Sequence, residues 1–191
     1  MVEDERKDIE SKVSKHIHNL KWLKIVGVGS VGSGKTSLIK YFCENKFSPG
    51  YQPTVGVDYG FKIETVDDKE VRIHLWDLSG DDDYYDTRIE LYGKTDGAFI
   101  TYDVTSTNSF DSVNFWYNEI NRICNPKPVV LLCACKVDQA NKRVISKEKG
   151  EEWAKQHRMG YFEVSAATGE NVFHMYNSLF LTIMKRQLKV A

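Results

Sequence analysis

The sequence has no long apolar run and no excess of charge of one sign. None of its hydrophobic stretches approaches the roughly 18 residues that a membrane-spanning helix requires. The formal net charge of the 191 residues is −1, which argues against a protein that bulk electrostatics hold to nucleic acid or to anionic lipid. We therefore expect a soluble protein that has no nucleic-acid partner.

Cysteine is scarce, and its spacing does not indicate a metal site. The four cysteines lack the spacing of zinc ligands and mostly lie in or beside apolar segments: Cys43, Cys124, Cys133 and Cys135. We interpret them as small buried residues in a reducing compartment rather than as disulfide partners. The first 19 residues are too highly charged for a signal peptide. Both observations predict a cytoplasmic location, with any membrane contact made through partners.

The length suits a single domain with a charged segment before it. A chain of this size buries one sizeable core, and 41% hydrophobic with 28% charged residues is typical of a globular protein. We expect a charged extension over residues 1–19 and a monomeric domain over residues 20–191. The apolar residues at helical spacing in the extension are Ile9, Val13, Ile17 and Leu20. They predict a marginal amphipathic helix or a frayed tail, and a partner or membrane role for it stays open.

Strand-like and helix-like segments alternate along the domain. Buried or alternating apolar runs predict strands at 22–28, 59–66, 70–77, 97–102, 129–133 and 161–164. Helical patterns lie at 35–44, 109–123, 146–157 and 172–188. This order predicts an α/β fold, with a six-stranded, mostly parallel sheet, one antiparallel strand and helices on both faces. Such sheets bind ligands beyond the carboxyl ends of their strands, so the loops there are candidate sites.

The loop after the first predicted strand, GSVGSGKT, has the pattern of a phosphate-binding loop. Its glycines let backbone N–H groups approach phosphate oxygens without a Cβ in the way, and the next helix presents its amino terminus to the anion. Lys35 would reach the β- and γ-phosphates, and the Thr36 hydroxyl would coordinate Mg²⁺. We therefore predict a P-loop NTPase that binds a nucleotide through Gly29, Ser30, Val31, Gly32, Ser33, Gly34, Lys35, Thr36 and Ser37.

Three later stretches narrow the class of nucleotide. LWDLSG places Asp77 at a strand end and Gly80 three residues on, CKVD follows a later strand, and SAA follows the last one. Together with the phosphate loop, these stretches resemble the Ras superfamily of small GTPases. Within it the chain is most similar to the Rab branch, in YQPTVGVDYGFKIE, TYDVTSTNSFDSVNFWYNEI and FEVSAATGENV. GVDYG is also similar to the Rab-like group related to J-domain-fused proteins, although we see no J domain in these 191 residues.

The resemblance implies a site for GTP or GDP with Mg²⁺. Thr54 would contact Mg²⁺ and the γ-phosphate in the GTP state only, and Gly80 would donate its N–H to the γ-phosphate. Phe47 corresponds to the aromatic residue that stacks on guanine, although alone it could be a core residue. The implied metal ligands are Thr36, Thr54 and Asp77. The implied base contacts are Cys135, Lys136, Asp138, Ser165, Ala166 and Ala167.

Among these base contacts, Asp138 would accept from guanine N1–H and the 2-amino group, which adenine cannot satisfy. Lys136 would lay its aliphatic stem along the base. Ser165 and the Ala166 N–H would support the loop and bind the guanine O6. Taken alone, Asp138 could instead be a helix cap. The ordered appearance of all these residues favours the guanine-binding interpretation.

Four positions depart from the family pattern. Val31 stands where the family has a small residue and would crowd the γ-phosphate and an incoming arginine finger. Asp81 replaces the glutamine that orients the attacking water, and its shorter, charged side chain cannot donate as an amide does. Cys135 replaces a base-binding asparagine with a weakly hydrogen-bonding thiol, and Ala167 replaces a lysine. We expect nucleotide binding to persist and hydrolysis to be very slow, with Lys35, Thr54, Gly80 and Asp81 at the impaired catalytic end.

Two other functions stay open. A non-hydrolysing pseudo-GTPase could serve as a protein-binding module, and its support is the loss of base contacts at Cys135 and Ala167. A nucleotide kinase could use the same phosphate loop, but it would need a lid rich in arginine, and the arginines are scattered along this chain. Measured nucleotide affinity separates a switch from a binding module, and phosphate transfer to a nucleoside monophosphate would reveal a kinase.

The resemblance also implies partners and a cellular role. A Rab-like protein acts in intracellular signalling and vesicle trafficking, and its effectors and regulators read the switch regions. The aromatic residues expected on that surface are Phe61, Trp76, Tyr84, Tyr85 and Tyr92. For Trp76, packing in the core is the more common alternative. The chain ends in KRQLKVA, without the prenylated cysteines of Rab proteins, and we therefore expect no prenyl anchor in this sequence.

Overall fold

The computed structural model of the chain describes residues 6, 12–13, 17, 20–50 and 52–189. The described residues of the charged extension, Arg6, Lys12, Val13 and Ile17, have helical backbone. The rest of the helix predicted there, including Ile9, lies outside the described residues. The boundary between the extension and the domain stays a prediction.

A six-stranded sheet forms the centre of the domain, in the order β2-β3-β1-β4-β5-β6. Neighbouring strands are parallel except for β2 and β3, which form one antiparallel pair. The predicted sheet is therefore confirmed, and most strands extend one or two residues beyond the predicted limits. Its strands are β1 (Lys21–Gly29), β2 (Val57–Val66), β3 (Lys69–Leu78), β4 (Gly97–Asp103), β5 (Val129–Cys135) and β6 (Gly160–Val164). Asp67 and Asp68 make the β2–β3 turn with φ of 52° and 58°, a conformation that aspartate tolerates better than most residues.

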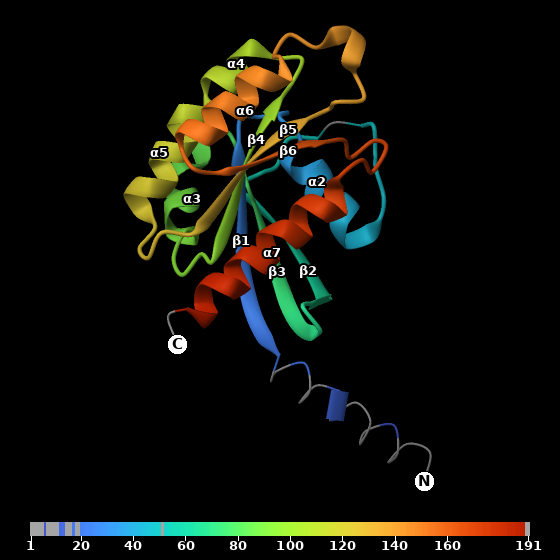
Figure 1. Cartoon of the computed structure of the whole chain (residues 1–191), viewed down its shortest axis with the longest axis vertical. Helices are drawn as coiled ribbons and strands as arrows, with labels where there is room; N and C mark the ends of the chain where they lie inside the picture. Colours follow the sequence, from blue (N-terminus) through green and yellow to red (C-terminus); the bar gives the residue numbers. More distant parts are fainter. Residues whose placement is uncertain (1–5, 7–11, 14–16, 18–19, 51, 190–191) are drawn as a thin grey trace.

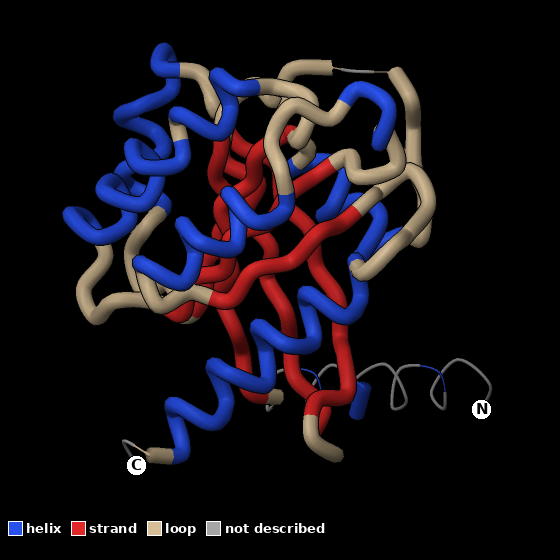
Figure 2. The backbone as a smooth tube through the Cα atoms, turned by 45° about the horizontal axis from the view of Figure 1, so that its top comes forward, coloured by secondary structure: helices blue, strands red, loops and turns tan. Residues whose placement is uncertain are grey.

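Helices cover both faces of this sheet, as predicted (Figures 1 and 2). The helices are α2 (Lys35–Glu44), α3 (Tyr85–Leu91), α4 (Thr107–Asp111), α5 (Val113–Ile123), α6 (Lys147–Gln156) and α7 (Val172–Leu188). Two short 3-10 turns, η1 (Asp82–Tyr84) and η2 (Ala140–Lys142), lie in loops. The single helix predicted at 109–123 is wrong in detail, because the chain forms α4 and α5 with a break at Ser112. The Ser106 hydroxyl caps α4 by accepting from the Ser109 N–H at 3.3 Å.

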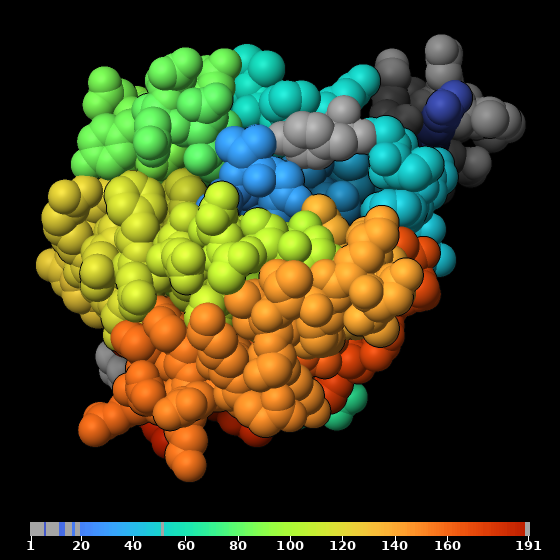
Figure 3. Space-filling model, turned by 90° about the horizontal axis from the view of Figure 1, so that it is seen from above, coloured from blue at the N-terminus to red at the C-terminus, as the bar shows by residue number. Residues whose placement is uncertain are grey.

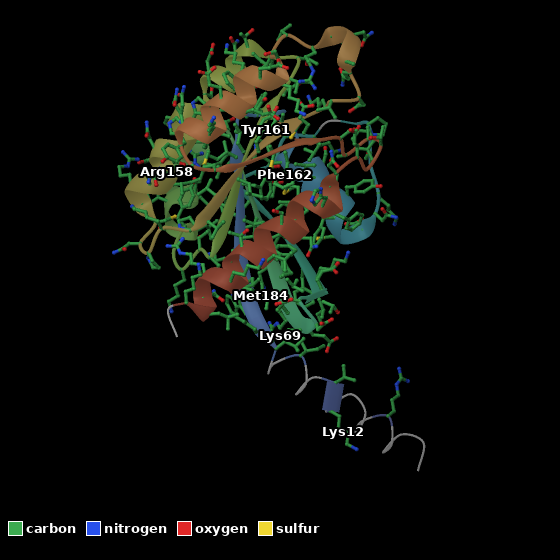
Figure 4. All side chains as sticks on the ribbon, in the orientation of Figure 1. Lys12, Lys69, Arg158, Tyr161, Phe162 and Met184 are labelled. Atoms are coloured by element: carbon green, nitrogen blue, oxygen red, sulfur yellow. The ribbon has the colours of Figure 1, made fainter. Side chains whose placement is uncertain are left out.

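Alternating side chains divide the core into two layers. On β1, Leu23 and Ile25 pack beneath α2 and α7, whereas Val26 and Val28 pack beneath the helices of the opposite face. The edge strand β6 alternates in the same way, with Phe162 toward the first layer and Tyr161 toward the second (Figure 4). This period of two is what a sheet covered on both faces requires. The layers hold the sheet rigidly, so the loops at its carboxyl edge start from fixed points.

Helix α3 was not predicted from the sequence. Of its seven residues, only Arg88 is buried, and one apolar pair at helical spacing, Tyr85 and Ile89, is too little in so short a segment to predict a helix. Polar contacts of Arg88, described below, hold this helix against α5. None of the helices in the described part of the chain is long and apolar enough to cross a membrane.

Candidate guanine-nucleotide site

A cleft of about 650 Å³ opens at the carboxyl edge of the sheet. Seen from above in Figure 3, the segment around residue 30 (blue) lies between the cyan segment that follows α2 and the green segment of α3. The predicted site residues that line the cleft are Val31, Gly32, Gly34, Lys35, Thr36, Ser37, Phe47, Thr54, Gly80, Asp81, Cys135, Lys136, Asp138, Ala166 and Ala167. The predicted residues that do not line it are Gly29, Ser30, Ser33, Asp77 and Ser165. One cleft thus gathers loops that follow four different strands.

The phosphate loop turns sharply between β1 and α2. Gly29 has φ of +143°, and a Cβ there would lie 2.4 Å from the Thr101 carbonyl oxygen, so only glycine fits. Gly34, with φ of +113°, caps the amino terminus of α2. That terminus directs free N–H groups into the cleft, which is the arrangement that binds phosphate.

Lys35 is buried at the base of this loop. Its Nζ donates to the carbonyl oxygens of Gly29 at 2.8 Å and Ser30 at 3.1 Å. Burial lowers the pKa of Lys35 to about 8, although the Asp77 carboxylate opposes that shift. An anion in the cleft would favour the ammonium form, so the side chain suits a phosphate ligand.

Three oxygen-bearing side chains meet beside Lys35. The Thr36 hydroxyl donates to Asp77 Oδ2 and lies 2.9 Å from the Thr54 hydroxyl, which itself donates to Asp77 Oδ2 at 3.3 Å. The other carboxylate oxygen, Asp77 Oδ1, is buried without a hydrogen-bond partner. Burial raises the pKa of Asp77, and the hydrogen bond from Thr36 and the charge of Lys35 oppose this. This set of one carboxylate, with an oxygen that lacks a partner, and two hydroxyls fits Mg²⁺. The ion needs few protein ligands when phosphates and water complete its coordination shell.

Gly80 packs directly against the phosphate loop. A Cβ at this position would lie 2.4 Å from the Gly29 carbonyl oxygen and 2.6 Å from the Val31 nitrogen. Backbone atoms cannot yield as a flexible side chain can, so the close approach of the two loops requires glycine. The neighbouring Ser79 N–H donates to the Gly56 carbonyl oxygen at 2.9 Å, which joins the segment after β3 to the loop before β2.

A Gly80→Ala variant is therefore expected to lose affinity for a triphosphate selectively. The displaced N–H would no longer reach the γ-phosphate, and a hydrogen bond to a charged group is worth about 1.5–3 kcal/mol, or roughly 10- to 150-fold. Calorimetric titration with GDP and with a non-hydrolysable GTP analogue measures this difference. Gly50→Ala is the control, since a Cβ at Gly50 meets nothing closer than 3.9 Å. Equal losses for both nucleotides would contradict this role of Gly80.

Val31 and Asp81 lie at the phosphate end of the cleft. The Val31 side chain is 51% exposed, so it is not part of the core. The Asp81 carboxylate accepts from the Asp83 N–H at 3.1 Å and so caps η1. In this position the Asp81 carboxylate brings a negative charge to the rim of a phosphate site and offers no hydrogen-bond donor.

The other end of the cleft is built from the loops after β5 and β6. The Ser165 hydroxyl, fully buried, donates to Asp138 Oδ1 at 2.5 Å and accepts from the Thr168 N–H at 3.2 Å. Lys136 has φ of 64°, and its Nζ lies 2.7 Å from Asp103 Oδ2. The Ser165 hydroxyl thus orients Asp138, whose carboxylate suits a ligand with adjacent N–H donors. Phe47 lines the same cleft with 42% of its surface exposed.

Cys135 is packed between its own strand and the phosphate loop. Its thiol donates to the Cys133 carbonyl oxygen at 3.7 Å, and a Cβ on Gly34 would lie 3.3 Å from its sulfur. Burial is the main cause of a raised pKa of Cys135, and the negative charge of Asp103 raises it further. The thiol therefore stays protonated near neutral pH. A protonated thiol is a weak hydrogen-bond partner for a purine.

A Cys135→Asn variant is expected to bind guanine nucleotide about 2- to 13-fold more tightly, because a good neutral hydrogen bond contributes roughly 0.5–1.5 kcal/mol. Dissociation constants for GDP measured by calorimetry would show the gain. Cys43→Asn is the control, because Cys43 is only partly buried and lies outside the cleft. Unchanged affinity in Cys135→Asn would mean that the base does not reach this position.

The structure adds functional residues that the sequence did not reveal, and it corrects one expectation. Ser79 and Arg88 hold the segment after β3, and Asp103 holds Lys136. The sequence offered one indication of these contacts: Glu119 is a charged residue within the apolar face of α5, and it is the partner of Arg88. Tyr92 is 1% exposed and is therefore not a surface anchor, because it packs in the core beside Glu119.

The fold and the site together define a P-loop nucleotide-binding domain with a mostly parallel sheet. The sequence profile of the Ras family matches residues 24–185, and the chain belongs to the Ras family. Members of this family are GTP-binding switches.

Individual relatives agree with this assignment. DnaJ homolog subfamily C member 27 of Danio rerio is 33% identical over 182 residues, which cover 92% of this chain and 67% of that protein. The proteins of the same name from Bos taurus and Homo sapiens are 34% and 32% identical over 167 residues, covering 85% of this chain and 61% of theirs. The chain thus spans about two thirds of the length of these relatives.

Proposed function

We propose that this chain is a Rab-like molecular switch that binds GTP or GDP with Mg²⁺ and hydrolyses GTP very slowly. The observation that carries the proposal is the composition of a single cleft. Lys35, Thr36 and Thr54 line one end, where both threonine hydroxyls bond the buried Asp77 carboxylate. The Asp138 carboxylate lines the other end. This spacing of a phosphate site and a base site suits one nucleotide.

Guanine is the base that this cleft suits best. The Ser165 hydroxyl orients the Asp138 carboxylate at 2.5 Å, and an ionised carboxylate only accepts hydrogen bonds. Guanine offers it two adjacent donors, at N1 and the 2-amino group, whereas adenine offers an acceptor at N1. Asp138 is exposed in the structure, and a base seated against it would shield its carboxylate from water. A carboxylate shielded in this way without a donor would cost about 1–3 kcal/mol, which supports discrimination against ATP.

Slow hydrolysis follows from Val31 and Asp81. The Val31 side chain lines the phosphate end of the cleft, where an arginine finger would enter. An arginine finger accelerates GTP hydrolysis about 10³–10⁵-fold. Its exclusion would therefore change turnover more than the weaker base contacts change nucleotide affinity. The Asp81 carboxylate accepts from the Asp83 N–H and has no amide with which to orient the attacking water, as the family's glutamine does.

Single-turnover hydrolysis of bound GTP by the purified chain tests this function. We expect tight binding of GDP and GTP in Mg²⁺ buffer, a hydrolysis rate well below that of an ordinary small GTPase, and GTP as the nucleotide that copurifies. A rate that matches an ordinary small GTPase, or GDP alone in fresh preparations, would overturn the proposed block of turnover.

A second function, a non-hydrolysing binding module, is supported by Cys135 and Ala167, which both weaken the base site. Effectors would then read the surface regardless of nucleotide. Exposed aromatic residues on β2, Tyr59 and Phe61, are suitable anchors for a protein partner. Micromolar or weaker affinity for both guanine nucleotides would favour this function over the switch. In either form we propose that the chain acts with protein partners in the cytoplasm, in signalling or vesicle trafficking.

A further inference from the structure

A pair of buried hydroxyls joins the phosphate loop to the sheet beneath it. Ser33, in the loop, is 1% exposed, and Thr101, on β4, is fully buried. Their side-chain oxygens lie 2.6 Å apart, which is hydrogen-bond distance for two hydroxyls. Neither residue lines the nucleotide cleft. Any effect of this pair on a bound nucleotide must therefore pass through the loop.

The direction of these hydrogen bonds follows from a third atom. Thr101 Oγ1 donates its single proton to the Val28 carbonyl oxygen at 3.3 Å. Thr101 can then only accept from Ser33, so the Ser33 hydroxyl is the donor of the pair. The bonds thus run in one line from the loop to β4 and on to β1. Without the Thr101 hydroxyl, the Ser33 hydroxyl would be buried without its acceptor.

The same pair supports the first residue of the phosphate loop. Gly29 is the register partner of Thr101 between β1 and β4. A Cβ on Gly29 would lie 2.5 Å from Thr101 Oγ1 and 2.9 Å from Ser33 Oγ, so the glycine backbone rests directly against both hydroxyls. The Gly29 carbonyl oxygen accepts from the Lys35 ammonium at 2.8 Å. A shift of the hydroxyl pair would therefore move the backbone that holds this lysine.

The far end of the loop depends on Ser33 as well. The Ser33 N–H donates to the Ser30 carbonyl oxygen at 3.1 Å and closes a turn of the loop. The next residue, Gly34, caps the amino terminus of α2. Because Ser33 precedes this cap directly, the anchor on its side chain fixes the backbone that leads into the phosphate-binding terminus.

We propose that Thr101 is a positioning residue for nucleotide binding, because its hydroxyl holds Ser33 and so keeps the phosphate loop in its binding conformation. A loop held in this way loses less freedom when a phosphate binds, and the ligand is therefore bound more tightly and released more slowly. This inference rests on the proposed function, since it concerns the release of a guanine nucleotide.

Release of a fluorescent GDP analogue from the full chain in Mg²⁺ buffer tests the inference. Thr101→Val keeps the side-chain volume but removes the hydroxyl, and we expect release to be roughly 3- to 10-fold faster, as for the loss of one neutral hydrogen bond. Ser33→Ala should accelerate release to a similar extent, because it breaks the same bond. Thr101→Ser retains the hydroxyl and should release GDP within about twofold of wild type.

The double variant separates positioning from simple stabilisation. Ser33→Ala with Thr101→Val removes both members of the pair, so the Ser33 hydroxyl is no longer buried without a partner. The free energy of unfolding of the nucleotide-free chain, measured with urea, should therefore be higher than in Thr101→Val alone. Release of GDP should stay as fast as in the single variants, because the two changes break one bond and do not add.

Thr95→Val is the matched control for Thr101→Val. It also removes a buried threonine hydroxyl, which donates to the Tyr92 carbonyl oxygen at 2.8 Å, and Thr95 does not line the cleft. We expect this variant to lower the free energy of unfolding and to leave GDP release as in wild type.

The inference and the proposed function fail in different ways. Tight nucleotide binding with unchanged GDP release in both single variants would overturn the role of Thr101 alone. Release from Thr95→Val as fast as from Thr101→Val would do the same, since release would then follow stability rather than the position of the loop. Failure of the wild-type chain to bind GDP or GTP in calorimetry would overturn the proposed function and this inference with it.

Discussion

Replacing Val31 with glycine and Asp81 with glutamine in one chain is expected to raise the single-turnover rate of GTP hydrolysis by roughly 10- to 100-fold. A fully positioned donor at developing charge is worth about 10²–10³ in rate, and the gain is smaller here because position 81 is exposed and holds its side chain less firmly. The glutamine removes a negative charge from the phosphate end of the cleft and supplies an amide that can orient water. The glycine removes a β-branched side chain that is 51% exposed there. Rapid-quench measurement of phosphate release from bound GTP follows the change.

Single variants and a neighbouring substitution make this result specific. Asp81→Gln alone should give most of the intrinsic gain, and Val31→Gly should matter chiefly when an activating protein supplies an arginine. Asp82→Gln is the control, because the Asp82 side chain is 90% exposed and the residue does not line the cleft. An unchanged rate in the double variant would mean that another feature of the site limits hydrolysis.

Replacing Lys35 with alanine is expected to weaken nucleotide binding by about 10²- to 10⁴-fold, because two hydrogen bonds to charged phosphates contribute roughly 1.5–3 kcal/mol each. The buried ammonium now bonds the Gly29 and Ser30 carbonyl oxygens, which also holds the loop in shape for the ligand. Calorimetry or displacement of a fluorescent guanine nucleotide measures the loss.

Lys40→Ala is the matched control for Lys35→Ala. Lys40 also lines the cleft, but its side chain is exposed and its nearest charged partner, Asp58 Oδ2, is 4.0 Å away. Only a small loss is expected there, since exposed charges are screened by solvent. Comparable losses in both variants would indicate that general positive charge, rather than a positioned ammonium, binds the phosphates.

Much of the fold could be predicted because its patterns are local. The strands at Gly97–Asp103 and Val129–Cys135 are continuous apolar runs, which a sheet covered on both faces requires. Helix α7, Val172–Leu188, was predicted at its observed limits from its apolar period. Helix α3 was missed because its burial depends on one arginine, and no short-range pattern marks an arginine that will find a carboxylate 31 residues away.

The candidate site, like the fold, could be predicted from the sequence only where its geometry is local. The phosphate loop could be identified from glycine, lysine and threonine spacing alone, since its geometry is a property of consecutive residues. The effect of Cys135 could be foreseen only in part. That this thiol would turn toward the Cys133 carbonyl and pack near Gly34 depends on how β5 and the phosphate loop approach each other.

By itself the sequence determined the alternation of strands and helices, the phosphate loop and the likeness to a family, because hydrophobic period and backbone freedom are set by neighbours along the chain. Only the tertiary structure brought Thr36, Thr54 and Asp77 to one point and closed Arg88 onto Glu119. Those contacts join residues far apart in the chain. Their distances depend on how the sheet and helices pack, which is a property of the whole domain rather than of any segment.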